Sequence, residues 1–233
     1  MRALGTVVTR RAMALALIPI LSGCGLLFRG ASEGSGSVED RAAPQQTEER
    51  EGMIPAGYGT LRQDDITMAL DGAELQVKVT PLVEEIIRVT APDTYERLSG
   101  LAHSHRELLE RRAPGRQDAK LFLVSLFSEI PDTTFEPEDL NLMSRGFRHR
   151  PLTIFPVTPG WTTGRLQPRR TEMAVYAFDS GLDLEGDIEV EYREHRSRSW
   201  ERILPRIEVE RSRVRARAAG ARQTSSPYFR ILR

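Results

Sequence analysis

The chain has 233 residues, of which 33 are basic and 33 acidic, so its formal net charge is zero. Its single cysteine excludes a disulfide framework within the chain and a cluster of thiolate metal ligands. A chain of this length can nevertheless fold by burying apolar side chains, without covalent crosslinks.

The first 24 residues have the pattern of an export signal. Arg2, Arg10 and Arg11 precede an apolar run over residues 12–21, and small residues lead to the cysteine in Leu21-Ser22-Gly23-Cys24. A basic start, a short apolar run and small residues before a cleavage point are typical of a secretory signal peptide. An apolar run of about ten residues is too short to cross a bilayer, which takes about twenty.

The motif Leu21-Ser22-Gly23-Cys24 resembles the lipobox of bacterial lipoproteins. The resemblance covers residues 1–25 and implies that residues 1–23 are a signal peptide. It also implies that Cys24 receives a diacylglyceryl thioether and becomes the acylated N-terminus of the mature chain. Several acyl chains hold a protein firmly on a membrane, whereas a single chain holds it marginally. Because residue 25 is glycine and not aspartate, the resemblance favours the outer membrane, facing the periplasm.

Residues 24–53 have the composition of a tether. Residues 31–51 contain six acidic side chains and two arginines, with Ser, Gly, Gln and Pro between them. Such a segment buries too little apolar surface to offset the entropy of ordering it. We expect a flexible connection with a reach of about 25–30 Å, followed by a folded domain over residues 54–217.

The domain begins with a strand pattern. Residues 66–70 and 75–79 each alternate apolar and polar side chains on either side of Asp71-Gly72. This pattern predicts a β-hairpin, because Asp-Gly suits a tight turn. Residues 86–89 predict a further short strand.

One helix interrupts the strands. Apolar residues recur at spacings of three and four over residues 93–112, which predicts an amphipathic helix with Asp93 or Thr94 as its cap. Strands are then expected at 121–127, 173–178 and 188–192. Leu121 to Phe127 is almost continuously apolar, so both faces of that strand should be covered. The predicted fold is mainly β, an antiparallel β-sandwich with one inserted amphipathic helix.

Two corner motifs suggest a more specific fold. The run from Phe135 to Leu140 contains Pro137, and Leu166-Gln167-Pro168 precedes the strand that ends at Phe178-Asp179. Residues 119–193 thereby resemble immunoglobulin-like domains of secreted bacterial proteins, and the resemblance implies an immunoglobulin-like sandwich.

The C-terminal segment is the richest in arginine. Residues 193–233 contain twelve arginines and four glutamates. Pro205 interrupts a helical pattern, so we expect a short helix, then a strand, then a disordered tail over 218–233. The strand would place a row of arginines on one side, and guanidinium groups bind phosphates and carboxylates of lipids or acidic partners. These arginines are Arg211, Arg213, Arg215 and Arg217. In the alternative interpretation they pair with Glu194, Glu201, Glu208 and Glu210 on a solvated strand.

No motif indicates catalysis, a metal or a cofactor. Ser125 lacks the Gly-x-Ser-x-Gly frame of a hydrolase, and the chain has no glycine-rich phosphate loop. His103 and His105 would point away from each other on a helix, so they cannot share a metal ion.

We therefore expect a non-enzymatic envelope lipoprotein, attached to the membrane through Cys24. Its sandwich would bind an envelope protein or an anionic lipid, and not nucleic acid, which an exported protein seldom meets. Two alternatives stay open. One is a sandwich that binds a glycan or a small apolar molecule in a pocket lined by Trp161 or Trp200. The other is a hydrolase whose catalytic residues are scattered along the chain.

Overall fold

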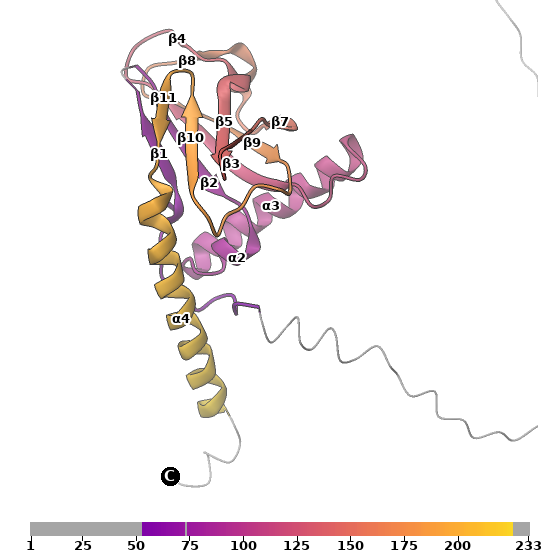
Figure 1. The fold of residues 1–233 in the computed structure, drawn as a ribbon, viewed down its shortest axis with the longest axis vertical. Coiled ribbons are helices and arrows are strands. Elements are labelled where there is room, and N and C mark those ends of the chain that lie inside the picture. Colours follow the sequence, from indigo (N-terminus) through magenta and orange to yellow (C-terminus); the bar gives the residue numbers. More distant parts are fainter. Residues whose placement is uncertain (1–52, 73, 226–233) are drawn as a thin grey trace, which may run out of the picture. The chain divides into compact units, whose positions relative to one another are not determined.

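The computed structural model describes residues 53–72 and 74–225. The chain is mainly β, and its sheets are antiparallel (Figure 1). The strands are β1 (Met68–Asp71), β2 (Gln76–Pro81), β3 (Lys120–Phe127), β4 (Thr133–Thr134), β5 (Leu140–Ser144), β6 (Phe147–His149), β7 (Thr153–Pro156), β8 (Arg165–Leu166), β9 (Thr171–Phe178), β10 (Ile188–Tyr192) and β11 (His195–Ser197). The helices are η1 (Gln63–Ile66), α2 (Glu84–Ile87), α3 (Pro92–Arg112), η2 (Pro137–Asp139), η3 (Pro159–Thr163) and α4 (Trp200–Ser225).

Two sheets form the body of the domain. The larger has the strand order β1-β2-β3-β9-β7, the smaller has the order β11-β10-β5-β6, and β4 pairs with β8 in a short ribbon. The sheets meet where the Ser197 hydroxyl on β11 donates to the Ala69 carbonyl on β1 at 2.6 Å. Apolar side chains from both sheets belong to one core. This arrangement is consistent with a β-sandwich, while the immunoglobulin-like topology stays a prediction.

Strand β3 is covered on both faces, as its apolar sequence predicts. On one face, Leu123 shares a register row with Val175 and Phe155. Helix α3 covers this face, since the His105 ring meets the Phe155 ring edge-on at 5.9 Å. Phe122 points to the opposite face, where its ring contacts another core phenylalanine. Helix α3 and the smaller sheet therefore sandwich the larger sheet.

The predicted hairpin is confirmed. Met68 pairs with Val79 across β1 and β2, and Gly72 donates its backbone N–H to the Leu75 carbonyl at 2.9 Å. Buried and more exposed residues alternate along β1 and over residues 76–79 of β2, whose last two residues are both buried. The period-two pattern therefore predicts the register correctly. The tight Asp71-Gly72 turn is wrong, because Asp71 belongs to β1 and pairs with Gln76, and neither residue has the positive φ that such a turn requires.

Helix α3 lies where the sequence pattern places a helix, although its start differs. Its N-cap is Ala91, which makes no side-chain capping bond, and Pro92 occupies the first turn. Proline suits this position because its fixed φ is already helical and its missing N–H would have no partner there. The expected caps Asp93 and Thr94 lie inside the helix.

The strand expected over residues 86–89 is wrong. Ile86 and Ile87 belong to α2, a single helical turn, and both are buried. The Arg88 N–H donates to the Glu84 carbonyl at 3.1 Å, a helical i to i−4 hydrogen bond that an extended strand does not make. The Glu84 carboxylate also fastens this turn to α3, because it accepts hydrogen bonds from Tyr95 and Ser99 at 3.2 and 3.1 Å.

The C-terminal strand is also wrong. Residues 200–225 form one helix, α4, which continues through Pro205. Its buried apolar residues follow helical spacing over about five turns: Trp200, Ile203, Ile207, Val214 and Ala218. Burial of such side chains, at about 1.5–3 kcal/mol each, outweighs the cost of one proline, about 3 kcal/mol. The fold therefore has a second long helix, and the tail expected from residue 218 does not begin there. Residues 1–52 and 226–233, with the predicted leader, most of the tether and the end of the tail, lie outside the described residues.

Two glycines, one against the backbone of Val89 and one on an open side of α3, provide a matched test of how tightly the domain is packed. An added Cβ at Gly59 would lie 2.2 Å from the Val89 carbonyl, whereas an added Cβ at Gly100 in α3 would meet nothing within 4 Å. We expect Gly59→Ala to lower the free energy of unfolding by about 1–3 kcal/mol, through overpacking. Gly100→Ala should raise it by about 0.5–1 kcal/mol, since alanine is the better helix former. Urea denaturation would contradict this packing if the two variants moved in the same direction.

Candidate functional site

Helix α4 does not bring the four predicted arginines together. At about 100° per residue, Arg211 and Arg215 lie on one side of the helix, and Arg213 and Arg217 lie on the other. A strand would have placed all four on one face, so the predicted row of arginines does not exist.

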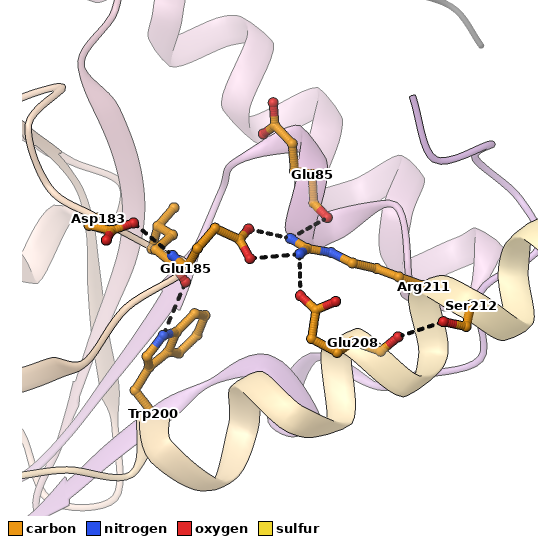
Figure 2. A network of polar contacts seen from close by, with 8 residues as sticks. Glu85, Asp183, Glu185, Trp200, Glu208, Arg211 and Ser212 are labelled. Carbon is orange, nitrogen blue, oxygen red and sulfur yellow. Dashed lines mark hydrogen bonds and ion pairs between the residues drawn. The ribbon is translucent and has the colours of Figure 1, made fainter. Parts of the chain in front are cut away.

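Arg211 is buried among acceptors of the protein itself. Its guanidinium donates to both carboxylate oxygens of Glu185 at 2.9 and 3.0 Å and also to Glu208 (Figure 2). A further bond of 3.3 Å reaches the Glu85 carbonyl. Burial alone would lower the pKa of Arg211, but the bonds and the charge of Glu185 outweigh it and raise the pKa. Arg211 is therefore already engaged within the domain.

This arginine fastens the loop before β10 to α4. The hydrogen bond from Arg211 lowers the pKa of Glu185 and keeps that carboxylate ionised. Next to it, Trp200 donates its indole N–H to the Leu184 carbonyl at 3.2 Å. The Asp183 carboxylate accepts the Glu185 backbone N–H at 3.0 Å (Figure 2). Two side chains of α4 thus hold two consecutive loop residues, Leu184 and Glu185.

A second ionic cluster surrounds Glu210 on the other side of α4. The Glu210 carboxylate is 2% exposed and accepts the Thr60 backbone N–H at 3.0 Å, the Thr60 hydroxyl at 2.8 Å and an Arg217 N–H at 2.9 Å. Arg213 lies 3.8 Å away, and Arg217 also donates to the Tyr58 carbonyl. Burial would raise the pKa of Glu210, but the bonds from Arg217 and Thr60 prevail and lower it. We call these residues the Glu210 clasp, because they join the first described segment to the last helix.

The alternative interpretation of the quartet therefore describes three of its members better. Arg211 pairs with Glu208, while Arg213 and Arg217 pair with Glu210. Arg215 is exposed in a groove of about 480 Å³ beside Met53 and Ile54, and it makes no ion pair within the described residues. Anion binding by the quartet stays a prediction.

The other residues considered in the sequence lie in the core or singly on the surface. Trp161 and Trp200 are 2% and 0% exposed, so their rings pack in the core and cannot stack on a ligand from solvent. His103 is exposed beside Glu107, and His105 is buried with its Nδ1 2.9 Å from the Leu101 carbonyl. Within residues 53–72 and 74–225, no group of three or more His, Cys, Asp or Glu could hold a metal ion. Cys24 lies outside these ranges.

A second group of arginines, which were not predicted as a site, lies on another part of the surface. Arg165, Arg169 and Arg170 line one groove of about 780 Å³ together with Glu172. A signal for them exists in the sequence: residues 140–171 contain six arginines and no acidic residue. In a chain with equal numbers of basic and acidic residues, this stretch has an unusual excess of positive charge.

The Glu210 clasp can be tested with a neighbouring glutamate as the control. We expect Glu210→Gln to lower the free energy of unfolding by about 1–3 kcal/mol, because it removes the buried charged acceptor of the hydrogen bonds from Thr60 and Arg217. Glu208→Gln removes a half-exposed carboxylate from Arg211, which keeps Glu185, so its effect should stay below about 1 kcal/mol. Equal effects of the two substitutions in thermal or urea unfolding would contradict the clasp.

The clasp also has a pH signature. A carboxylate whose folded pKa is lowered stabilises the fold above its unfolded pKa, and this contribution is lost as the pH falls through the folded value. The stability difference between the wild type and Glu210→Gln should therefore be largest near neutral pH and shrink below about pH 4. A difference that stays constant from pH 7 to pH 3 would exclude an ionised Glu210 as its cause.

None of the helices in the described part of the chain is long and apolar enough to cross a bilayer. Searches of protein-family models, curated proteins and solved structures found no match to this chain.

Proposed function

We propose that this protein is a membrane-anchored envelope lipoprotein, whose domain is a non-enzymatic module that binds or assembles with another envelope component. The observation that carries the proposal is the position of the only cysteine, at the end of the lipobox Leu21-Ser22-Gly23-Cys24. Acyl chains on Cys24 would fix the protein to the outer membrane on its periplasmic side.

The spacing between the anchor and the domain supports this proposal. Residues 25–52 separate Cys24 from the first described residue, Met53, and their polar composition suits a tether. With a reach of about 25–30 Å, such a tether lets a domain turn toward a partner above the membrane.

The first residues of the domain are held firmly by the rest of the fold, which suits the point where a tether would join it. Ile54 is 5% exposed within the core, and its carbonyl accepts a hydrogen bond from Arg88 at 3.0 Å. A few residues later, the Glu210 clasp holds Tyr58 and Thr60. Tension on a tether that enters here would therefore act on ionic and apolar contacts with α4 and α2.

The proposal includes an immunoglobulin-like sandwich over residues 119–193, which would suit an adhesion or assembly module. The glycan-binding alternative gains no support from the tryptophans, because both rings are buried in the core. The shifted pKa values of Glu185, Glu210 and Arg211 follow from burial and from the protein's own hydrogen bonds and charges. No observation therefore favours the scattered-site hydrolase.

The anchor can be tested by replacing the cysteine. We expect Cys24→Ser to move the protein from the membrane pellet to the soluble fraction, because its acylation site is gone. Ser22→Ala, which keeps a small residue in the motif, should remain in the pellet. Intact-mass analysis of the wild type should show cleavage before Cys24 and acyl chains on it. A native product that keeps Met1 and a free thiol would refute the lipoprotein assignment.

The binding role needs a separate measurement. We expect the wild-type protein, extracted in mild detergent, to co-purify with an envelope component at a fixed stoichiometry. Preparations that consist of this chain alone, after crosslinking in intact cells, would contradict the role as an assembly module.

A further inference from the structure

The groove lined by Arg165, Arg169 and Arg170 lies beside η3, β8 and the start of β9. We call it the arginine groove; Thr158, Thr163 and two acidic residues, Asp132 and Glu172, also line it. Figure 1 shows β4 and β8 at the upper end of the domain, whereas the first described segment lies below the sheets, beside α4. The groove is therefore remote from the point where the chain enters the domain.

The arginines of this groove are not neutralised by the protein. The guanidinium groups of Arg165, Arg169 and Arg170 make no hydrogen bond or ion pair with any described residue, and all three side chains belong to exposed residues. By contrast, Arg145 in the same acid-free stretch donates to Asp183 at 2.9 Å. The groove thus gathers positive charge that has no internal partner.

Arg169 is also held in an unfavourable backbone conformation. Its φ is +57°, and it lies in a turn closed by the Arg170 N–H to the Gln167 carbonyl at 3.1 Å. Glycine or asparagine usually occupies such a position, because a Cβ disfavours positive φ. Arg193 has a positive φ as well, but its side chain is fixed by Asp139 at 3.1 Å. Strain at a residue without an internal partner is typical of a functional position.

One wall of the groove is acidic and rigid. Glu172 is 7% exposed and accepts a hydrogen bond from the Thr158 hydroxyl. Its carboxylate lies directly against Gly160, where an added Cβ would come within 2.1 Å of Oε1. A ligand must therefore turn its anionic oxygens toward the arginines, and it can offer a hydroxyl group to Glu172.

We propose that the arginine groove binds a phosphate group carried on a hydroxyl-bearing compound, either a glycerol-based lipid headgroup or a phosphorylated sugar. Three guanidiniums offer more donors than the two oxygens of one carboxylate can accept, whereas a phosphate has more oxygens and more charge. This inference rests on the proposed function, since it names the chemistry by which the tethered module would recognise an envelope component.

The first experiment measures binding to the full chain carrying Cys24→Ser, which lacks the anchor. Calorimetry with inorganic phosphate, glycerol 1-phosphate and glucose 1-phosphate tests the soluble probes, and flotation with vesicles of phosphatidylglycerol in phosphatidylcholine tests the lipid surface. We expect binding that weakens with salt and that falls at least about tenfold in Arg165→Gln/Arg170→Gln. The control Arg111→Gln/Arg202→Gln removes the same charge from exposed residues elsewhere and should bind like the parent.

The probes separate the two sources of phosphate. Binding to the sugar phosphate alone identifies a saccharide ligand, and binding to the vesicles alone identifies a headgroup; either result supports the groove. Glucuronate, which carries a carboxylate on a sugar, should bind at least about tenfold more weakly than glucose 1-phosphate. The inference is overturned if no phosphate probe binds, if glucuronate binds equally well, or if the control pair loses as much affinity as the groove pair.

Arg169 permits a second test, in which one of the two measurements, the melting temperature, needs no probe. Arg169→Asn relieves the positive φ, so we expect an unchanged or higher melting temperature together with weaker phosphate binding. A lower melting temperature would show that Arg169 has a structural role and would contradict the inference.

The outcomes also separate this inference from the proposed function. Loss of phosphate binding in the groove variants does not alter acylation at Cys24. If the groove variants of the wild-type chain remain in the membrane pellet but no probe binds, the groove is refuted and the anchor stands. If Cys24→Ser stays in the pellet while the soluble probes still bind in detergent, the anchor is refuted and the groove stands.

Discussion

The C-terminal helix depends on charge pairs that are buried against the rest of the domain. Arg211 and Glu210 are consecutive residues of opposite charge that point to different sides of α4. Arg211 reaches the loop before β10, while Glu210 reaches the first described segment. Either charge alone would be costly to bury, so each requires its partners from a distant part of the chain. The two pairs thereby define where α4 can lie.

This arrangement changes the meaning of the arginine-rich C-terminus. A high local count of arginine suggests a surface for anions, but three of the four candidates on α4 are neutralised by glutamates of the same domain. The arginines of residues 165–170 are fewer, yet they have no such partners among the described residues. The availability of a charge to a ligand thus depends on tertiary pairing more than on the number of charges in a segment.

The strands were predictable where a local rule was sufficient. The hairpin of β1 and β2 follows from alternation, and the coverage of β3 follows from its continuous apolar sequence. Helix α4 was not predictable by the same rules, because the proline at 205 suggests an interruption and Ile207 and Val209 also fit a strand. Apolar residues recur at helical spacing from Trp200 to Ala218, which favours a helix. This pattern becomes decisive only when the structure shows that these side chains are buried against the rest of the domain. The same limit applies to the site, since the sequence does not show which arginines meet a carboxylate.

The edges of both sheets determine how a partner could be recognised. The outermost strands β1, β6, β7 and β11 have three or four residues each, and β7 ends in Pro156, which has no backbone N–H to donate. Short edges with proline offer little main chain for another strand to join. An incoming polypeptide could therefore not simply lengthen either sheet. Selectivity in this protein would have to reside in side chains, which single substitutions can retune without disturbing the scaffold.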